Sequence, residues 1–372
     1  MGNAGGVRSG VTALGVADAQ VTLKLERLIG WRGAGVFFSL LDTHGGSPSA
    51  QIGDVQGVSN LQAPAALRLE EAWLQQNLFG NRLSLLVGRY DLSTEFYHLQ
   101  SAMLFENSSF GIGPEFAQSG TGGPSIFPNT AVGTRIAFKP RANAVLRVAV
   151  LDGAPVGWFN GGPLIFAPGD GALLVGEVAL LSRPDIAGEP RRRRFQIGRG
   201  TRRSYAAKLA LGAWYYTAQF PDLADTLSSG VPVRHRGSSG IYLIADQTLR
   251  SASDTSSGPL TAFVQLGFGD GRVNQVDRYV GIGLTRAAPF FGRSQDELGL
   301  AVAAAHNGSH YERANASPGA ATASETAVEL TYLAQLLTWM AVQPDVQYVI
   351  HPGGKTGRRN ATVFGLTIGL SH

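Results

Sequence analysis

The sequence has no cysteine, few charged residues and no long uninterrupted apolar run. Without cysteine there is no disulfide framework, no thiolate zinc site and no cysteine nucleophile. Charged residues make up 16% of the chain, against roughly 25% in soluble domains. No apolar run reaches the ~18 residues that a membrane-spanning helix needs. The net charge of +4 is small for 372 residues, so nothing indicates a nucleic-acid partner.

Glycine and short alternating runs are abundant instead. There are 49 glycines, and hydrophobic residues make up 44% of the chain. In the last stretch, NATVFGLTIGLSH, Phe364, Leu366 and Ile368 take alternate positions, with small or polar residues between them. Side chains alternate across a strand, so this stretch has one apolar face and one small, polar face. A soluble sandwich would bury the apolar face, whereas a membrane barrel would turn it to lipid.

Read for a period of two, the sequence predicts a long series of strands. Many are longer than the ~5–6 residues of an ordinary globular strand, and they suit the ~9–11 residues of a tilted membrane-spanning strand. The fifteen predicted strands are 19–28, 34–42, 67–76, 82–91, 130–139, 143–152, 172–183, 204–217, 239–250, 259–269, 276–287, 296–306, 325–336, 339–350 and 360–371. Because no linker or composition shift divides the chain, we expect a single all-β domain over residues 1–372.

Most of the links between these strands alternate in length, and residues 184–203 are an exception, a long link where a short one is expected. The short links follow odd-numbered strands and lie near 29–33, 77–81, 140–142 and 336–338. The long links follow even-numbered strands and lie at 43–66, 92–129, 153–171, 218–238 and 307–324. Outer-membrane barrels have short periplasmic turns and long external loops. This orientation needs one strand before the first, for which residues 6–16 are the candidate, and the total becomes sixteen, an even number.

Charged side chains occupy the second face of several predicted strands. Arg135 and Lys139, for example, share one face of strand 130–139. Such charges need water or partners, which a water-filled interior supplies and a dry core does not. A transmembrane antiparallel barrel of this size is too wide for side chains alone to fill. The longest link, residues 92–129, is therefore predicted to fold into the lumen as a constriction.

Several blocks of the sequence have a recognisable pattern. They include LEEAWLQQNLFGNRLSLLVGRYDLSTEF, LFENSSFGIGPEF and LTYLAQLLTWMAVQPDVQYVIHPGG, and they run in order from about residue 67 to the end. These blocks resemble the carbohydrate-selective porins of Gram-negative outer membranes. The resemblance implies an outer-membrane barrel that passes glucose and related sugars by diffusion. It also implies an eyelet lined by charged and aromatic side chains. On the matching blocks these would include Glu71, Trp73, Arg89, Asp91, Glu329 and Asp345.

A neutral sugar offers hydroxyl groups and flat apolar C–H faces to such an eyelet. Charged side chains form stronger hydrogen bonds with hydroxyls than neutral ones do, and aromatic rings can stack on the C–H faces. Arg89 and Asp91 are two apart in the sequence, as are Glu71 and Trp73, so we predict that these four contribute to the constriction wall. Arg135 would add positive charge to the lumen. The alternative is a network of ion pairs that only braces the barrel.

Other functions fit the sequence less well. A general or acidic-solute porin could use the same barrel without any preference for sugars. An outer-membrane lipid hydrolase would need a Ser–His pair, but there is no GxSxG motif, so we expect no enzyme activity. A soluble propeller would need a repeat of ~40–50 residues, and none is found.

No metal site and no cofactor is expected. His306 and His310 in HNGSH have the i, i+4 spacing that brings two ligands together on a helix, but this stretch is predicted as a loop. The expected partners are mono- and small oligosaccharides in the lumen, with outer-membrane lipid and lipopolysaccharide around the barrel. The run Arg191 to Arg194 is interpreted as a solvated loop. The sequence leaves open whether three barrels associate as a homotrimer.

Overall fold

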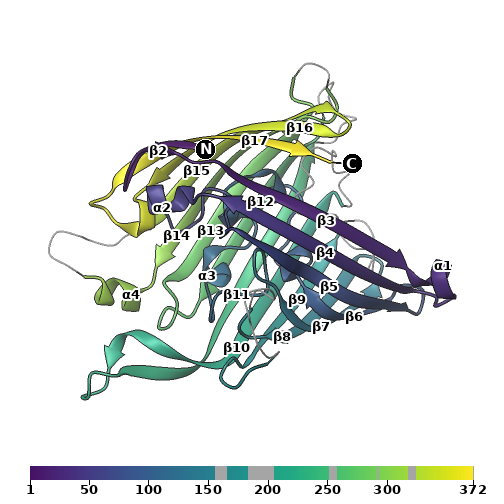
Figure 1. Cartoon of the computed structure of the whole chain (residues 1–372), viewed down its shortest axis with the longest axis horizontal. Helices are drawn as coiled ribbons and strands as arrows, with labels where there is room; N and C mark the ends of the chain where they lie inside the picture. Colours follow the sequence, from purple (N-terminus) through teal and green to yellow (C-terminus); the bar gives the residue numbers. More distant parts are fainter. Residues whose placement is uncertain (156–165, 183–204, 251–257, 291–292, 317–323, 372) are drawn as a thin grey trace.

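The computed structural model describes residues 1–155, 166–182, 205–250, 258–290, 293–316 and 324–371. Its strands form one sheet of 17 strands (Figure 1). The predicted link 184–203, with its arginine run, lies outside the described residues.

All fifteen predicted strands are present. They are β3 (Leu14–Lys24), β4 (Ala34–Gly45), β5 (Ala66–Leu78), β6 (Leu83–Tyr90), β7 (Ala131–Arg141), β8 (Ala144–Asp152), β9 (Ala172–Leu181), β10 (Ala207–Thr226), β11 (Pro232–Arg250), β12 (Leu260–Gly269), β13 (Val276–Ala287), β14 (Glu297–Asn307), β15 (Glu325–Leu337), β16 (Met340–Ile350) and β17 (Arg359–Leu370). From β3 to β17 each strand pairs antiparallel with the next one along the chain.

The predicted strand at residues 6–16 is wrong. Two short strands, β1 (Gly2–Gly6) and β2 (Gly10–Val11), take its place, which gives 17 strands instead of sixteen. Gly5 and Gly6 have φ angles of 91° and 74°, a left-handed backbone that does not continue a strand, and the pairing register shifts between them. β1 pairs with both β17 and β2, so the first residues lie beside the last strand (Figure 1).

The predicted long link at residues 218–238 is also wrong. β10 and β11 extend through it as a hairpin, and only residues 227–231 connect them. The extension is rich in Asp, Arg, His, Gly and Ser, so it lacks the apolar alternation that marks a strand within a membrane. In the predicted loop 307–324, residues Ser309–Ala314 form the helix α4. A second short helix, α1 (Leu25–Ile29), replaces the end of the first predicted strand.

The shortest links lie at one end of the barrel and the longest at the other, although the β10–β11 connection, residues 227–231, is a short link at the long-link end. Residues 25–33, 79–82, 142–143 and 338–339 connect strands at the end that carries α1, which we call the turn end. The constriction loop (residues 92–129) and α4 belong to the opposite end, which we call the loop end (Figure 1). In outer-membrane barrels in general, the end with the long loops faces the cell exterior.

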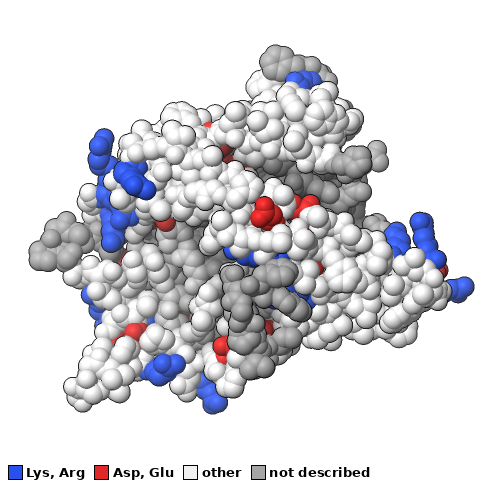
Figure 2. Space-filling view, viewed as in Figure 1, with Lys and Arg blue, Asp and Glu red and all other residues white. Residues whose placement is uncertain are grey.

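The apolar faces of the strands point outward, as the alternation predicts. On β7, Ile136 is 50% exposed and its neighbour Arg135 only 1%. On β17, Leu366 is 60% exposed, whereas Val363 is fully buried on the inner face beside Ile52 and Val58. Figure 2 shows a mostly uncharged surface over the strands, with a small group of charged residues near the middle of the view and other Lys and Arg residues toward the edges. The apolar face that the alternation predicts is therefore the outer surface of the sheet.

The helices of the structure are short. Besides α1 and α4 they include α2 (Pro48–Ile52) and α3 (Pro114–Ala117). None of the helices among the described residues is both long and apolar enough to cross a membrane.

Replacing Ile136 by arginine tests the outward face. The side chain lies between Leu85 and Val148 of the neighbouring strands, and both of these are also exposed. An arginine facing lipid near the bilayer midplane costs roughly 2–4 kcal/mol, so we expect a clear loss of folded barrel on refolding into lipid bilayers. Leu28→Arg, on α1 at the turn end, is the matched control and should refold like the original chain. Equal yields for both variants would contradict a lipid-facing position for Ile136.

Candidate constriction site

Residues 92–129 fold into the interior of the barrel, as predicted. They form the short helices η1 (Leu92–Thr94), η2 (Ala102–Leu104), η3 (Ser108–Phe110) and α3, and α3 is seen inside the sheet in Figure 1. Apolar side chains of the loop pack on inward-facing aromatic residues. Phe116 stacks on Trp214 of β10, with ring centroids 4.3 Å apart, and Phe110 meets the edge of Phe263 of β12 at 5.9 Å. The loop therefore narrows the lumen.

Three inward-facing carboxylates hold the backbone of the constriction loop. They come from β9, β11 and β15, and each accepts hydrogen bonds from backbone N–H groups. The contacts are Tyr97 N to Glu177 Oε2 at 3.0 Å, Ser101 N to Asp246 Oδ2 at 3.1 Å, Glu106 N to Glu329 Oε1 at 2.7 Å and Asn107 N to Glu329 Oε2 at 2.9 Å. Charge-assisted bonds of this kind are stronger than neutral ones. The loop is thus fixed at several points around the wall.

Glu177 is also the centre of a buried ion cluster. Its Oε1 lies 3.2 Å from the Arg147 guanidinium and 3.5 Å from Lys208 Nζ, and its Oε2 accepts a hydrogen bond from the Tyr242 hydroxyl at 3.0 Å. All of these side chains are buried. Buried charges need partners, and here two cations share one carboxylate.

Arg135 of β7 also connects the constriction loop to the barrel wall. Its Nε lies 2.7 Å from Glu95 Oε2 in the constriction loop. Its terminal nitrogens donate to Ser84 Oγ at 2.8 Å and to Gln75 Oε1 at 3.0 Å. The guanidinium of Arg135 thus contacts one residue of the loop and two residues of the wall.

A cavity of about 220 Å³ lies where residues 55–62 meet the constriction loop. Its polar lining consists of the amide and hydroxyl side chains of Gln56, Asn60, Gln62, Ser108, Ser109 and Gln118. Its apolar lining includes Ile112, Ile126 and Phe127. Gln56 is held by Glu325, which accepts from its backbone N–H at 3.0 Å, while Gln56 Oε1 has no hydrogen-bond partner among the described residues. The cavity therefore combines amides, hydroxyls and an aromatic ring.

Comparison with a protein-family model identifies the family to which this chain belongs. The model described as "Carbohydrate-selective porin, OprB family" matches residues 8–371. The chain belongs to this family. It is accordingly a porin of the Gram-negative outer membrane, and the resemblance seen in the sequence is confirmed.

Individual relatives agree with this assignment. The porin is 26% identical over 383 residues to "Porin B" of Pseudomonas aeruginosa, covering 94% of this chain and 79% of that protein. Its fold matches the high-pH structure of Pseudomonas putida OprB with a TM-score of 0.83 and 22% identity, covering 99% of this chain and 90% of that one. The low-pH structure of the same protein matches with a TM-score of 0.53 and 16% identity, covering 96% and 85%.

Glu71 and Trp73 of the porin lie together on the inner face of β5. Trp73 Nε1 donates to Glu71 Oε2 at 2.7 Å, and the indole stacks on Phe37 of β4 with centroids 5.0 Å apart. The pairing register shifts between Ser39 and Leu40, so Glu70 is an extra residue on β5 and is buried as well. Period-two reasoning missed Glu70 because a β-bulge breaks the alternation.

Arg89 and Asp91 are two positions apart in the sequence, but their side chains have different hydrogen-bond partners. Arg89, near the end of β6, donates from Nε to Thr130 Oγ1 at 2.9 Å. Asp91 lies beyond the strand and caps η1, where its Oδ1 accepts from the backbone N–H and the hydroxyl of Ser93 at 2.8 and 2.7 Å. Both side chains are buried. Their contacts in this structure fix the start of the constriction loop.

Glu329 and Asp345 face the interior from the neighbouring strands β15 and β16. Both oxygens of Glu329 are taken by the constriction loop. Asp345 Oδ2 accepts from Gln347 Nε2 at 3.0 Å, and its Oδ1 has no hydrogen-bond partner among the residues that the structure describes. Asp345 is 3% exposed, so this oxygen is buried in the wall.

Sequence reasoning did not select Asp246 and Lys208 as site residues. Both are buried on inner faces, and Lys208 Nζ donates to the carbonyl of His98 in the loop at 2.8 Å. A signal was available, since Asp246 keeps the same parity as the inward-facing Tyr242 and Ile244 on β11. Alternation along a predicted strand therefore identifies a charged residue on the inner face as a candidate site residue.

Proposed function

We propose that this porin passes glucose and related neutral carbohydrates by passive diffusion and holds them weakly beside the constriction loop. The observation that carries this proposal is the cavity between residues 55–62 and the loop. Its amides and hydroxyls can exchange hydrogen bonds with sugar hydroxyls, and Phe127 offers a ring for a C–H face. Several modest contacts suit a pore, because a solute must be able to leave as well as enter.

The predicted site residues enter the proposal in two ways. Arg135, Glu329, Arg89 and Asp91 shape the constriction, because their polar atoms bind the loop or the strand ends next to it. Asp345 shapes the constriction as well, because it faces the interior from β16 and its Oδ2 accepts a hydrogen bond from Gln347. The Glu71–Trp73 pair supplies a further polar and aromatic surface on the wall.

A general or acidic-solute porin is the second candidate. It would draw anions to unpaired cations in the lumen. Arg147 and Lys208, however, share the carboxylate of Glu177, and Arg135 is paired with Glu95. Each of these three cations thus lies against a carboxylate, and none of them is an isolated positive charge that would draw anions, which favours neutral solutes.

The surroundings of the barrel form part of the same proposal. The outward leucine, isoleucine and valine side chains contact lipid acyl chains, and the loop end meets lipopolysaccharide. Chain association in a mild detergent, measured by light scattering, tests whether a homotrimer forms.

Single-channel conductance with increasing glucose tests the sugar proposal. We expect a saturable, concentration-dependent block in the original chain. Phe127→Ala and Gln56→Leu each remove a cavity contact worth about 1 kcal/mol, so each should weaken the block roughly fivefold. Phe268→Ala is the matched control, because Phe268 is on the outer face and 48% exposed.

Liposome swelling with glucose, a disaccharide and an organic acid completes this test. Faster permeation of glucose than of an organic acid of equal size supports a sugar channel. Equal rates for both solutes, together with no block by glucose, would contradict the sugar preference and favour the general porin.

A further inference from the structure

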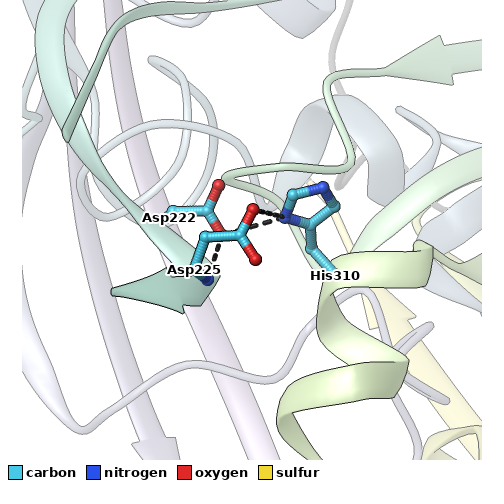
Figure 3. A group of neighbouring side chains, drawn as sticks. All are labelled: Asp222, Asp225 and His310. Atoms are coloured by element: carbon cyan, nitrogen blue, oxygen red, sulfur yellow. Dashed lines mark hydrogen bonds and ion pairs between the residues drawn. The ribbon is translucent and has the colours of Figure 1, made fainter. Parts of the chain in front are cut away.

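A cluster of two carboxylates and an imidazole lies at the loop end, away from the constriction loop. Asp222 and Asp225 come from the extended part of β10, and His310 comes from α4 (Figure 3). One possible ligand atom from each of the three side chains lies within 4.8 Å of the others. His310 Nδ1 is 2.9 Å from Asp222 Oδ1 and 3.9 Å from Asp225 Oδ2. Three groups that commonly bind metal ions thus point to one place.

Neighbouring groups hold the two carboxylates in position. The backbone N–H groups of Ala224 and Asp225 each donate to Asp222 Oδ1 at 2.8 Å, and His235 Nε2 lies 2.7 Å from Asp222 Oδ2. The Arg313 guanidinium lies 3.2 Å from Asp225 Oδ1, the oxygen that does not face His310. Supporting contacts of this kind orient the ligands in metal sites.

The charges of the cluster leave room for a cation. The cluster brings two carboxylates together with one imidazole. Arg313 balances one of the two negative charges. Asp222 is buried, but Asp225 is 52% exposed, so an ion can reach the group from solvent.

We propose that Asp222, Asp225 and His310 bind a divalent first-row transition-metal ion of the Zn²⁺ type. Imidazole and carboxylate together suit Zn²⁺, Ni²⁺ or Cu²⁺, whereas Mg²⁺ and Ca²⁺ prefer oxygen ligands alone. The ion takes the place of the proton between His310 Nδ1 and Asp222. With metal–ligand bonds of ~2.0–2.2 Å, this needs the two side chains to move apart by only a few tenths of an ångström. Water fills the remaining positions.

The i, i+4 pair of HNGSH is not the basis of this site. His306 is the last residue but one of β14, and its Nδ1 lies 3.1 Å from Asp277 Oδ1, whereas His310 is on α4 and contacts Asp222 of β10. The ligands therefore come from segments 88 positions apart in the sequence. A bound ion would fasten α4 to the β10–β11 hairpin at the loop end.

Calorimetric titration of the detergent-solubilised full chain with ZnCl₂ tests the proposal. We expect one Zn²⁺ per chain, with Mg²⁺ and Ca²⁺ showing no comparable binding. His310→Ala and Asp225→Asn should each weaken Zn²⁺ binding at least tenfold. His306→Ala is the matched control, because its imidazole is four residues away and pairs with a different carboxylate; it should bind like the original chain.

X-ray absorption at the zinc edge gives a second readout, independent of the variants. We expect nitrogen and oxygen neighbours only, with scattering from a single imidazole. Folding of each variant is checked by its heat-modifiable mobility in gel electrophoresis. Zn²⁺ binding that is unchanged in folded His310→Ala or Asp225→Asn overturns the proposal, and so does the absence of binding by the original chain.

Discussion

Replacing Glu329 by leucine is expected to raise the single-channel conductance and to abolish the saturable block by glucose. Glu329 accepts the backbone N–H groups of Glu106 and Asn107, and it is fully buried. Leucine has a similar size but no acceptor, so both amides lose their partner. An unsatisfied buried N–H costs about 1–3 kcal/mol. The loop segment at η3 should therefore leave the wall, which widens the lumen beside the proposed sugar site.

Conductance in planar bilayers measures this effect, and Glu26→Gln is the control. Glu26 is 60% exposed on α1 at the turn end and makes only a 4.0 Å contact with Arg32. Its variant should conduct like the original chain. A Glu329→Leu channel with unchanged conductance and glucose block would show that the constriction loop does not depend on this anchor.

Replacing Glu177 by glutamine is expected to make the channel select for anions and to lower its resistance to heat. Arg147 and Lys208 lose the carboxylate that they share, while the amide can still accept a bond from Tyr97 or Tyr242. Breaking a buried ion pair by removing one partner costs about 3–5 kcal/mol. Unbalanced positive charge in the wall attracts anions. The reversal potential in a KCl gradient and the temperature of the gel-mobility shift measure the two effects.

The double variant Glu177→Gln with Lys208→Met is the matched control for charge. It removes one carboxylate and one ammonium together, so the selectivity should return toward that of the original chain. If the single variant already shows no change in reversal potential, the cluster around Glu177 does not influence the field in the lumen.

The membrane-spanning part of the fold was predictable because its physical rule is simple. Lipid demands an apolar residue at every second position, and the inner face tolerates small or charged residues. Strands such as β7 and β16 were therefore found within one or two residues of their bounds. Outside the membrane, strands do not need an apolar residue at every second position. The hairpin extension of β10 and β11 has a polar sequence in which Asp222 and His235 pair across the strands, and no hydrophobic pattern marks it.

The candidate site was predictable only in part. Alternation placed Arg135 on an inner face, the family resemblance implied Glu329 and Asp345, and the length of residues 92–129 indicated an inward loop. The partners of these side chains could not be predicted, because they are backbone amides. Glu106 and Glu329 are 223 positions apart, and any residue except proline could supply the N–H. The bulge that brings Glu70 inward likewise has no sequence signal that separates it from regular alternation.

The position of the loop anchors in the chain sets an order of assembly. The constriction loop is synthesised before β9, β11 and β15, which carry Glu177, Asp246 and Glu329. The last of these anchors, Glu329 on β15, lies in the final third of the polypeptide, so docking of the loop can be complete only when β15 is in place. We therefore expect the loop segment before η3 to reach its final position late in the assembly of the barrel.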